Sequence, residues 1–297
     1  ERMYEAIYML RNKYHFNGYI HVKAIPGAPD DIIYALGFLV DRMSVNLELP
    51  TAEGLKRLAP NKKPKNLIRP IQQIQRGIQT QRLALGKDSR MERAKGNQYL
   101  SNSIFNEKNV SGIHERSVVS LMEGIQKDET NIENNKDNLH DKDFLPSDFL
   151  QNTGKRTRSH FVPAGQSTQM IIGASGESDF HLLSLTQRLY QQYDMKRVFY
   201  SAYVPLNDDP ELPAIGTAPP LLREHRLYQA DWLLRYYGFQ ADELLSSDRP
   251  NFNTFVDPKC DWALRHLEYF PIEINQASYE QLLRVPGIGN KSAGRIV

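Results

Sequence analysis

The sequence contains a single cysteine, Cys260, in 297 residues. One thiol excludes an internal disulfide framework, and it excludes a zinc or iron–sulfur centre held only by cysteines of this chain. No apolar run approaches the roughly 18 residues that a membrane-spanning helix needs. These absences favour a reducing compartment, and we predict a cytoplasmic protein with no membrane partner.

Acidic residues are absent from two stretches of the chain. One runs from Gly54 to Lys87 and the other from Gln281 to Val297. A block of one charge sign favours a polyanionic partner, although a solvated helical face gives the same pattern. The first stretch carries nine basic residues: Lys56, Arg57, Lys62, Lys63, Lys65, Arg69, Arg76, Arg82 and Lys87.

Apolar segments with strand and helix character alternate along much of the chain. A helix is expected after the cap residue Thr51. Alternating strands and helices indicate a parallel sheet with right-handed crossovers. We predict strands at 18–25, 43–49, 169–172 and 197–204, and helices at 1–17, 28–39, 178–193 and 221–237. The polar residues 166–169 are expected to lead into the third of these strands.

The run from 97 to 152 differs in composition from the rest. It holds nine asparagines, and ten acidic against five basic residues. Such a polar segment with weak periodicity predicts an insertion or mobile loop that adds nothing to the core. The chain begins at Glu1 without methionine and ends at Val297, each inside an expected helix. We therefore expect a fragment of a longer protein.

The segment from Leu282 to Val297 indicates a helix, a tight turn and a second helix. Two glycines in Pro286-Gly287-Ile288-Gly289 leave the turn's backbone bare, so a phosphate can approach it. The pattern resembles the helix-hairpin-helix motif, which binds DNA backbone without sequence preference. The alternative is a helical corner that only packs. The resemblance implies DNA contacts from Val285, Gly287, Ile288, Gly289, Lys291, Ser292 and Arg295.

Residues 171–177 form a second motif, a turn of the type Ile-x-Gly-x-x-Glu after a strand. It resembles the fifth-strand motif of radical S-adenosylmethionine (radical SAM) enzymes. Longer phrases, Arg42–Thr51, Pro163–Met170 and Leu221–Trp232, resemble the DNA modification/repair radical SAM protein family. The resemblance covers about 1–85 and 155–297.

This resemblance implies an α/β fold, with an incomplete (β/α) barrel of parallel strands and a small α-helical C-terminal region. The barrel would span 1–96 and 156–240, interrupted by the insertion at 97–155, and the helix-hairpin-helix region would span 241–297. S-adenosylmethionine is the implied cofactor. Its expected contacts are Asn46, Glu48, Ile172, Gly173, Ala174, Ser175 and Glu177. For Glu48, the alternative is an ion pair with a helix lysine.

The family's Cys-x-x-x-Cys-x-x-Cys motif, which binds a 4Fe-4S cluster, is absent here. Its ligands are expected upstream of residue 1, so no metal site and no catalytic residue are assigned in this chain. The intact protein is expected to be a radical SAM enzyme for DNA modification or repair, and this fragment alone to be inactive. The family is associated with a uracil-DNA-glycosylase-like partner.

Two other functions remain open. The first is a non-catalytic DNA-binding adaptor that recruits a repair enzyme such as a uracil-DNA-glycosylase-like protein. The second is an α/β enzyme whose Gly173–Gly176 turn binds a phosphate. The charged residues between Arg223 and Asp231 are expected to pair with one another along their own helix, since they are spaced by three to five residues.

Overall fold

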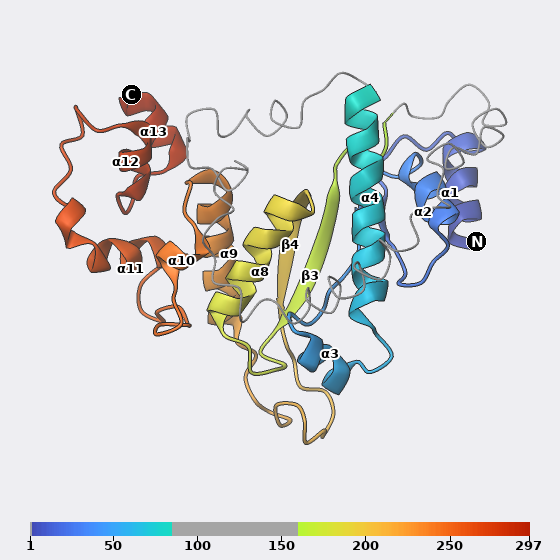
Figure 1. The fold of residues 1–297 in the computed structure, drawn as a ribbon, viewed down its shortest axis with the longest axis horizontal. Coiled ribbons are helices and arrows are strands. Elements are labelled where there is room, and N and C mark those ends of the chain that lie inside the picture. The colour runs from blue at the N-terminus through green and yellow to red at the C-terminus, as the bar shows by residue number, and fades with distance from the viewer. Residues whose placement is uncertain (1, 85–159) are drawn as a thin grey trace, which may run out of the picture.

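The computed structural model describes residues 2–84 and 160–297. The expected insertion at 97–152 lies outside these residues. Within them the chain forms four strands, ten α-helices and one 3-10 helix (Figure 1). The α/β class predicted from the sequence is therefore confirmed.

The four strands form one parallel sheet. They are β1 (His21–Lys23), β2 (Arg42–Ser44), β3 (Gln166–Ile172) and β4 (Met195–Ala202). Their order in the sheet, β1-β2-β3-β4, is also their order in the sequence. Consecutive right-handed crossovers in one direction place the connecting helices on the same face of the sheet.

A helix precedes β1, and helices follow each strand, as the alternation predicted. They are α1 (Arg2–Asn12), α2 (Asp30–Gly37), α3 (Ala52–Leu58), α4 (Pro64–Ala84), α8 (Asp179–Gln192) and α9 (Leu221–Tyr236). In the sheet's helical layer, α4 packs against β3 and α8 against β4 (Figure 1). Thr51 caps α3, because its hydroxyl accepts a hydrogen bond from the Gly54 amide at 3.0 Å.

The main core lies between the sheet and this helical layer. Met43, Met170 and Val198 are fully buried on the strands, and α4 contributes Ile71 and Ile74. The register aligns a second set of residues, which alternates with the buried apolar ones along β2, β3 and β4. This set faces away from the helices and is mainly polar, with five polar and two apolar members: Ser44, Ser167, Gln169, Arg197, Ser201, Ile171 and Phe199.

The predicted limits of all four strands differ from those observed, because β1 is shorter than 18–25 and β4 is shifted from 197–204. The differences at β2 and β3 affect the candidate site. The strand expected at 43–49 keeps its regular pairing only to Ser44, and the chain then turns at Glu48, whose φ is 65°. The Leu47 amide donates to the Thr168 hydroxyl at 3.1 Å. Conversely, the polar residues from Gln166 onwards belong to β3 itself. Buried polar side chains on a strand are tolerated where they have hydrogen-bond partners. The side-chain amide of Gln166, for example, donates to the Tyr193 carbonyl.

Side chains from two helices cover the outer edge of β4. The amide of Val198 donates to the Tyr190 hydroxyl at 3.1 Å, and that of Tyr200 to the Tyr228 hydroxyl at 3.0 Å. Further along, the Ala202 amide donates to the Glu224 carboxylate at 2.6 Å. The outward amides of this edge strand are thus satisfied without another strand.

The C-terminal region is helical and lies to one side of the sheet (Figure 1). Its elements are α10 (Ala241–Leu244), α11 (Pro258–Arg265), the 3-10 helix η3 (Leu267–Tyr269), α12 (Tyr279–Arg284) and α13 (Asn290–Ile296). Leu282, Leu283 and Ala293 form a small second core. Cys260 lies in the first turn of α11. Among the helices of the described residues, none is long and apolar enough to cross a membrane.

Candidate functional site

The carboxyl edge of the sheet brings together the residues expected to contact a cofactor. The Glu48 amide donates to the Gln169 carbonyl at 2.9 Å, and the Glu48 carbonyl accepts from the Ile171 amide at 2.7 Å. The Asn46 side chain donates to that of Gln169 at 3.2 Å. Ligands of parallel α/β sheets bind outside this edge of the strands, so the grouping has the position of a ligand site.

The Glu48 carboxylate has two lysine partners. One is Lys62, which precedes α4, and the other is Lys23 of β1, whose ammonium nitrogen lies 3.8 Å from a carboxylate oxygen. The ion pair with a helix lysine that the sequence left open is thus replaced by pairs with a strand lysine and a lysine just before a helix. A cofactor amine at Glu48 would have to exchange with one of these ammonium groups.

The turn after β3, residues 173–177, is tightly packed. Gly173 has a φ of +85°, and a Cβ atom added there would lie 2.7 Å from Pro220 Cγ. Glu177 accepts hydrogen bonds from the hydroxyls of Thr51, at 3.2 Å, and Ser175. The polar side chains of the turn thus bind one another and the start of α3.

Arg223 of α9 fixes the far end of this turn. It donates to the Glu177 carbonyl and to the carboxylate of Asp179, and the Asp179 side chain is 3% exposed. The other Asp179 oxygen accepts the Phe252 amide at 3.0 Å. Asp179 therefore joins the turn to the segment that leads into the C-terminal region.

The pairing expected along α9 was wrong for Arg223 and Arg226. Arg226 donates to the backbone carbonyls of Asn253 and Thr254, both at 3.2 Å. Asp231 instead pairs with Arg235, at 2.7 Å. Burial raises the pKa of Asp231, and Arg235 opposes that rise. Elements outside α9 therefore decided the partners of Arg223 and Arg226, whereas buried Asp231 has a close partner four residues further along its own helix.

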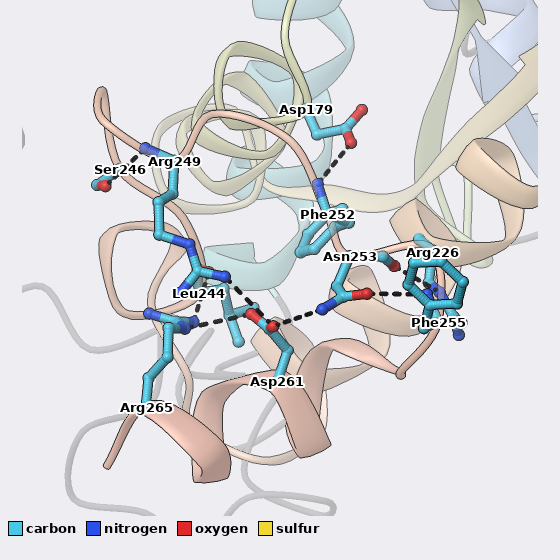
Figure 2. A network of polar contacts seen from close by, with 10 residues as sticks. All are labelled: Asp179, Arg226, Leu244, Ser246, Arg249, Phe252, Asn253, Phe255, Asp261 and Arg265. Atoms are coloured by element: carbon cyan, nitrogen blue, oxygen red, sulfur yellow. Dashed lines mark hydrogen bonds and ion pairs between the residues drawn. The ribbon is translucent and has the colours of Figure 1, made fainter.

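Figure 2 shows a network of hydrogen bonds and ion pairs that connects the 246–255 segment to α11. Asp261 of α11 accepts from Asn253 at 3.2 Å and pairs with Arg265 at 3.2 Å and Arg249 at 3.4 Å. Arg265 also donates to the Leu244 carbonyl at 2.9 Å. One buried carboxylate thereby holds the 246–255 segment against α11, so α11 is a fixed support for the helices that follow it.

The predicted helix, turn and helix at the C-terminus are present as α12 and α13. Ser278 and Gln281 form a capping box at the start of α12. Between the helices, Gly287 has a φ of +84° and is exposed, and a Cβ atom there would have nothing within 4 Å. The Ile288 amide closes the turn by donating to the Val285 carbonyl at 3.1 Å. Lys291, Ser292 and Arg295 are exposed on α13.

A buried lysine attaches this hairpin to α11. Lys259 is 7% exposed, donates to the Ile288 carbonyl at 2.6 Å and lies over the Tyr237 ring at 4.8 Å from its centroid. Burial lowers the pKa of Lys259 to about 8, while nearby Asp257 opposes that shift. The sequence interpretation missed this residue. Its spacing of three and four from the buried Trp262 and Ala263 was the available signal.

The basic stretch from Gly54 to Lys87 is partly neutralised by acidic residues outside it. Arg57 pairs with Glu211 at 3.0 Å, and Arg69 pairs with Asp30 at 2.6 Å. Further ion pairs join Lys62 to Glu48 and Arg82 to Asp194. Lys87 lies outside the described residues. The stretch is therefore a weaker indication of a polyanion than its composition suggested.

The described residues offer no iron–sulfur site. Residues 2–84 and 160–297 contain no group of three or more His, Cys, Asp or Glu side chains that could hold a metal ion. A 4Fe-4S cluster needs several cysteine ligands, and the sequence has only Cys260. The residues of this chain do not fit that cluster.

Comparison with known protein families, characterised proteins and solved structures found no match. The family resemblance therefore stays a prediction. The sheet edge and the hairpin are the two regions whose geometry bears on function.

Proposed function

We propose that the chain is the DNA-binding portion, with part of the barrel, of a radical SAM enzyme that modifies or repairs nucleic acid. The observation that carries the proposal is the open hairpin turn. Gly287 is exposed there at positive φ, with space around the position of a Cβ atom. Lys291 and Arg295 lie exposed on the helix that follows.

The hairpin has features suited to phosphate contact. A turn without side chains lets phosphate oxygens approach the backbone closely, and the two cations add attraction that depends on salt. Contacts of this kind position DNA but do not read its sequence. Lys259 supports the proposal further, because its bond to the Ile288 carbonyl holds the turn in place before DNA arrives.

The barrel part of the proposal is supported by the sheet. Strands in strictly sequential order are typical of a barrel segment, whereas doubly wound sheets reverse their order at a switch point. The sheet face away from the helices is mainly polar, as a cofactor-binding interior requires. Asn46, Glu48 and residues 172–177 would hold S-adenosylmethionine, which supplies a deoxyadenosyl group when bound. Cysteines for its partner cluster would come from outside this chain.

DNA binding is tested by Gly287→Ala in the full chain. The added methyl group occupies the turn surface, so we expect the affinity for duplex DNA of random sequence to fall at least tenfold in fluorescence anisotropy. The matched control is Gly216→Ala. Gly216 also has a positive φ, +90°, and open space around it. Unchanged DNA affinity in Gly287→Ala would show that the hairpin is not the contact.

Lys291→Ala and Arg295→Ala test the electrostatic part. Each should weaken binding to every DNA sequence alike, and each lost phosphate contact should reduce the salt slope by about 1. A slope equal to that of the unaltered chain in both variants would contradict their proposed role.

The single cysteine favours a second candidate for this chain alone, the non-catalytic adaptor that recruits a glycosylase-like protein. The two are separated with the protein as its gene encodes it, including any segment before Glu1. After anaerobic loading with iron and sulfide, the enzyme cleaves S-adenosylmethionine when reduced. If the cluster is loaded but S-adenosylmethionine is not cleaved, the enzyme is contradicted and the adaptor is the function that stands. DNA binding by the hairpin is common to both.

A further inference from the structure

A cavity of about 230 Å³ lies where the hairpin meets the body of the C-terminal region. Its walls come from three places. Tyr237 follows α9, Trp262 and Tyr269 belong to α11 and η3, and Arg284 belongs to α12 of the hairpin. The cavity is therefore built jointly by the hairpin and its support.

Flat aromatic rings form much of this wall. The Trp262 and Tyr269 rings are stacked, with centroids 5.8 Å apart and an interplanar angle of 27°. Trp262 is buried, whereas Tyr269 is 59% exposed. The Arg284 guanidinium lies over the Trp262 ring at 5.1 Å from its centroid, so the exposed ring is that of Tyr269. Protein sites for unpaired bases of single strands use exposed aromatic rings, because every base has a flat face to stack.

The charges in the cavity favour a base over a phosphate. Glu243 and Glu280 line it, and the Glu243 carboxylate pairs with Arg284 at 3.1 Å. Carboxylates repel phosphate, but they accept hydrogen bonds from the amino groups on base edges. Gln281 also lines the cavity, and its side-chain oxygen is bound by the Ser278 amide at 2.8 Å, which orients its amide.

Size limits the occupant to one ring system. Sites for drug-sized ligands have volumes of roughly 300–1,000 Å³, so this cavity is too small for a whole nucleotide cofactor. It is also next to the phosphate-binding turn. Tyr237 lines the cavity, and its hydroxyl lies 3.3 Å from the position of a Cβ atom on Gly289.

We propose that this cavity takes one unpaired nucleobase from the DNA strand whose backbone the hairpin holds. The proposal depends on the DNA binding proposed above, and it adds a base contact beside the phosphate contact. A base within a duplex is already stacked and paired, so only a single-stranded or flipped base enters.

The test compares two labelled single strands of equal length and charge, one with bases and one made of abasic deoxyribose phosphates. We expect the full chain to bind the strand with bases about 5- to 100-fold more tightly, since stacking on an aromatic side chain is worth roughly that factor per base. Tyr269→Ala should remove most of this preference and leave abasic binding unchanged. Tyr269→Phe should keep the preference, and Tyr19→Ala, at a tyrosine that is 60% exposed elsewhere, should have no effect.

Tryptophan fluorescence gives a second reading. The chain has two tryptophans, so Trp232→Phe leaves Trp262 as the only one. Its emission should be quenched by the strand with bases and not by the abasic strand. Equal, salt-dependent affinity for both strands would overturn the base site and leave the hairpin function intact. Absence of binding to either strand and to duplex DNA would overturn both.

Discussion

Two glycines at turns of this protein have nearly the same φ angle but differ in the atoms that surround them. Gly173 and Gly287 have φ values of +85° and +84°. A Cβ atom on Gly173 would meet Pro220 at 2.7 Å, but one on Gly287 would meet nothing within 4 Å. At Gly173 the first turn is covered by Pro220, whereas at Gly287 the second presents bare backbone to solvent. A glycine pattern thus predicts the turn, whereas its surroundings decide which part of its backbone a ligand can reach.

The largest effect is expected at the carboxylate that secures the packed turn. Asp179→Ala leaves Arg223 and the Phe252 amide without their partner, and removing one member of a buried pair costs about 3–5 kcal/mol. Urea denaturation should show this loss in the free energy of unfolding. The control Asp248→Ala, at an exposed position, should stay within about 0.5 kcal/mol. An equal effect of the two variants would mean that the packed turn is not secured in this way.

Gly173→Ala should have the next largest effect. A left-handed φ costs an alanine about 1–2 kcal/mol, and the contact with Pro220 adds about 1–3 kcal/mol. We expect a loss of about 2–5 kcal/mol in the same measurement. Gly176→Ala, in the same turn with open space and no positive φ, should be nearly neutral. If both variants were neutral, the turn would be as open as that of Gly287.

The open turn should show a pH dependence through Lys259. Its pKa falls to about 8 on folding, from about 10.4 in the unfolded chain. The unfolded chain then binds more protons between these values, so stability rises with pH, by about 1.5 kcal/mol between pH 8 and 9.5. The raised pKa values of Tyr190 and Tyr200 oppose this only near pH 10 and above. Lys259→Met should abolish the rise, and a rise that persists in that variant would assign it to another group.

The smallest effect on stability is expected at Gly287. Gly287→Ala adds strain of about 1–2 kcal/mol and no clash, so its main result should be lost DNA binding. In contrast, Gly294→Ala lies within α13 with only an ordinary contact at 3.8 Å, and it should stabilise the helix by about 0.5–1 kcal/mol. Thermal unfolding of the two variants should therefore shift in opposite directions. Shifts of the same sign would contradict the assigned conformations.

Local signals in the sequence were sufficient for much of the fold. The Thr51 cap, the alternation of strands and helices, and the hairpin around Gly287 all depend on residues close in the chain. The parallel order of the sheet then followed from the preferred hand of crossovers.

Other features could not be predicted, because their partners are distant in the chain. Arg226 binds Asn253, and Lys259 binds Ile288, and no spacing rule along one helix reports such contacts. The early end of β2 has the same origin. The Glu48 backbone pairs singly with Met170 of β3 where a regular strand was expected to continue. At the candidate site, the sequence singled out Glu48 and Gly287. It did not identify Lys23 and Lys62 as the partners of Glu48, or Lys259 as the support of the turn at Gly287.

Because the edge of β4 is covered, only the opposite edge of the sheet, as the described residues form it, is open to a further strand. Tyr190, Tyr228 and Glu224 occupy the outward amides of that strand, so another chain cannot add to it as a template. Within the described residues, no strand pairs with the opposite edge, that of β1. There, exposed His21 and Lys23 flank buried Val22, and a charged side chain at an edge discourages indiscriminate pairing. Any strand that enlarges this sheet would therefore join beside β1.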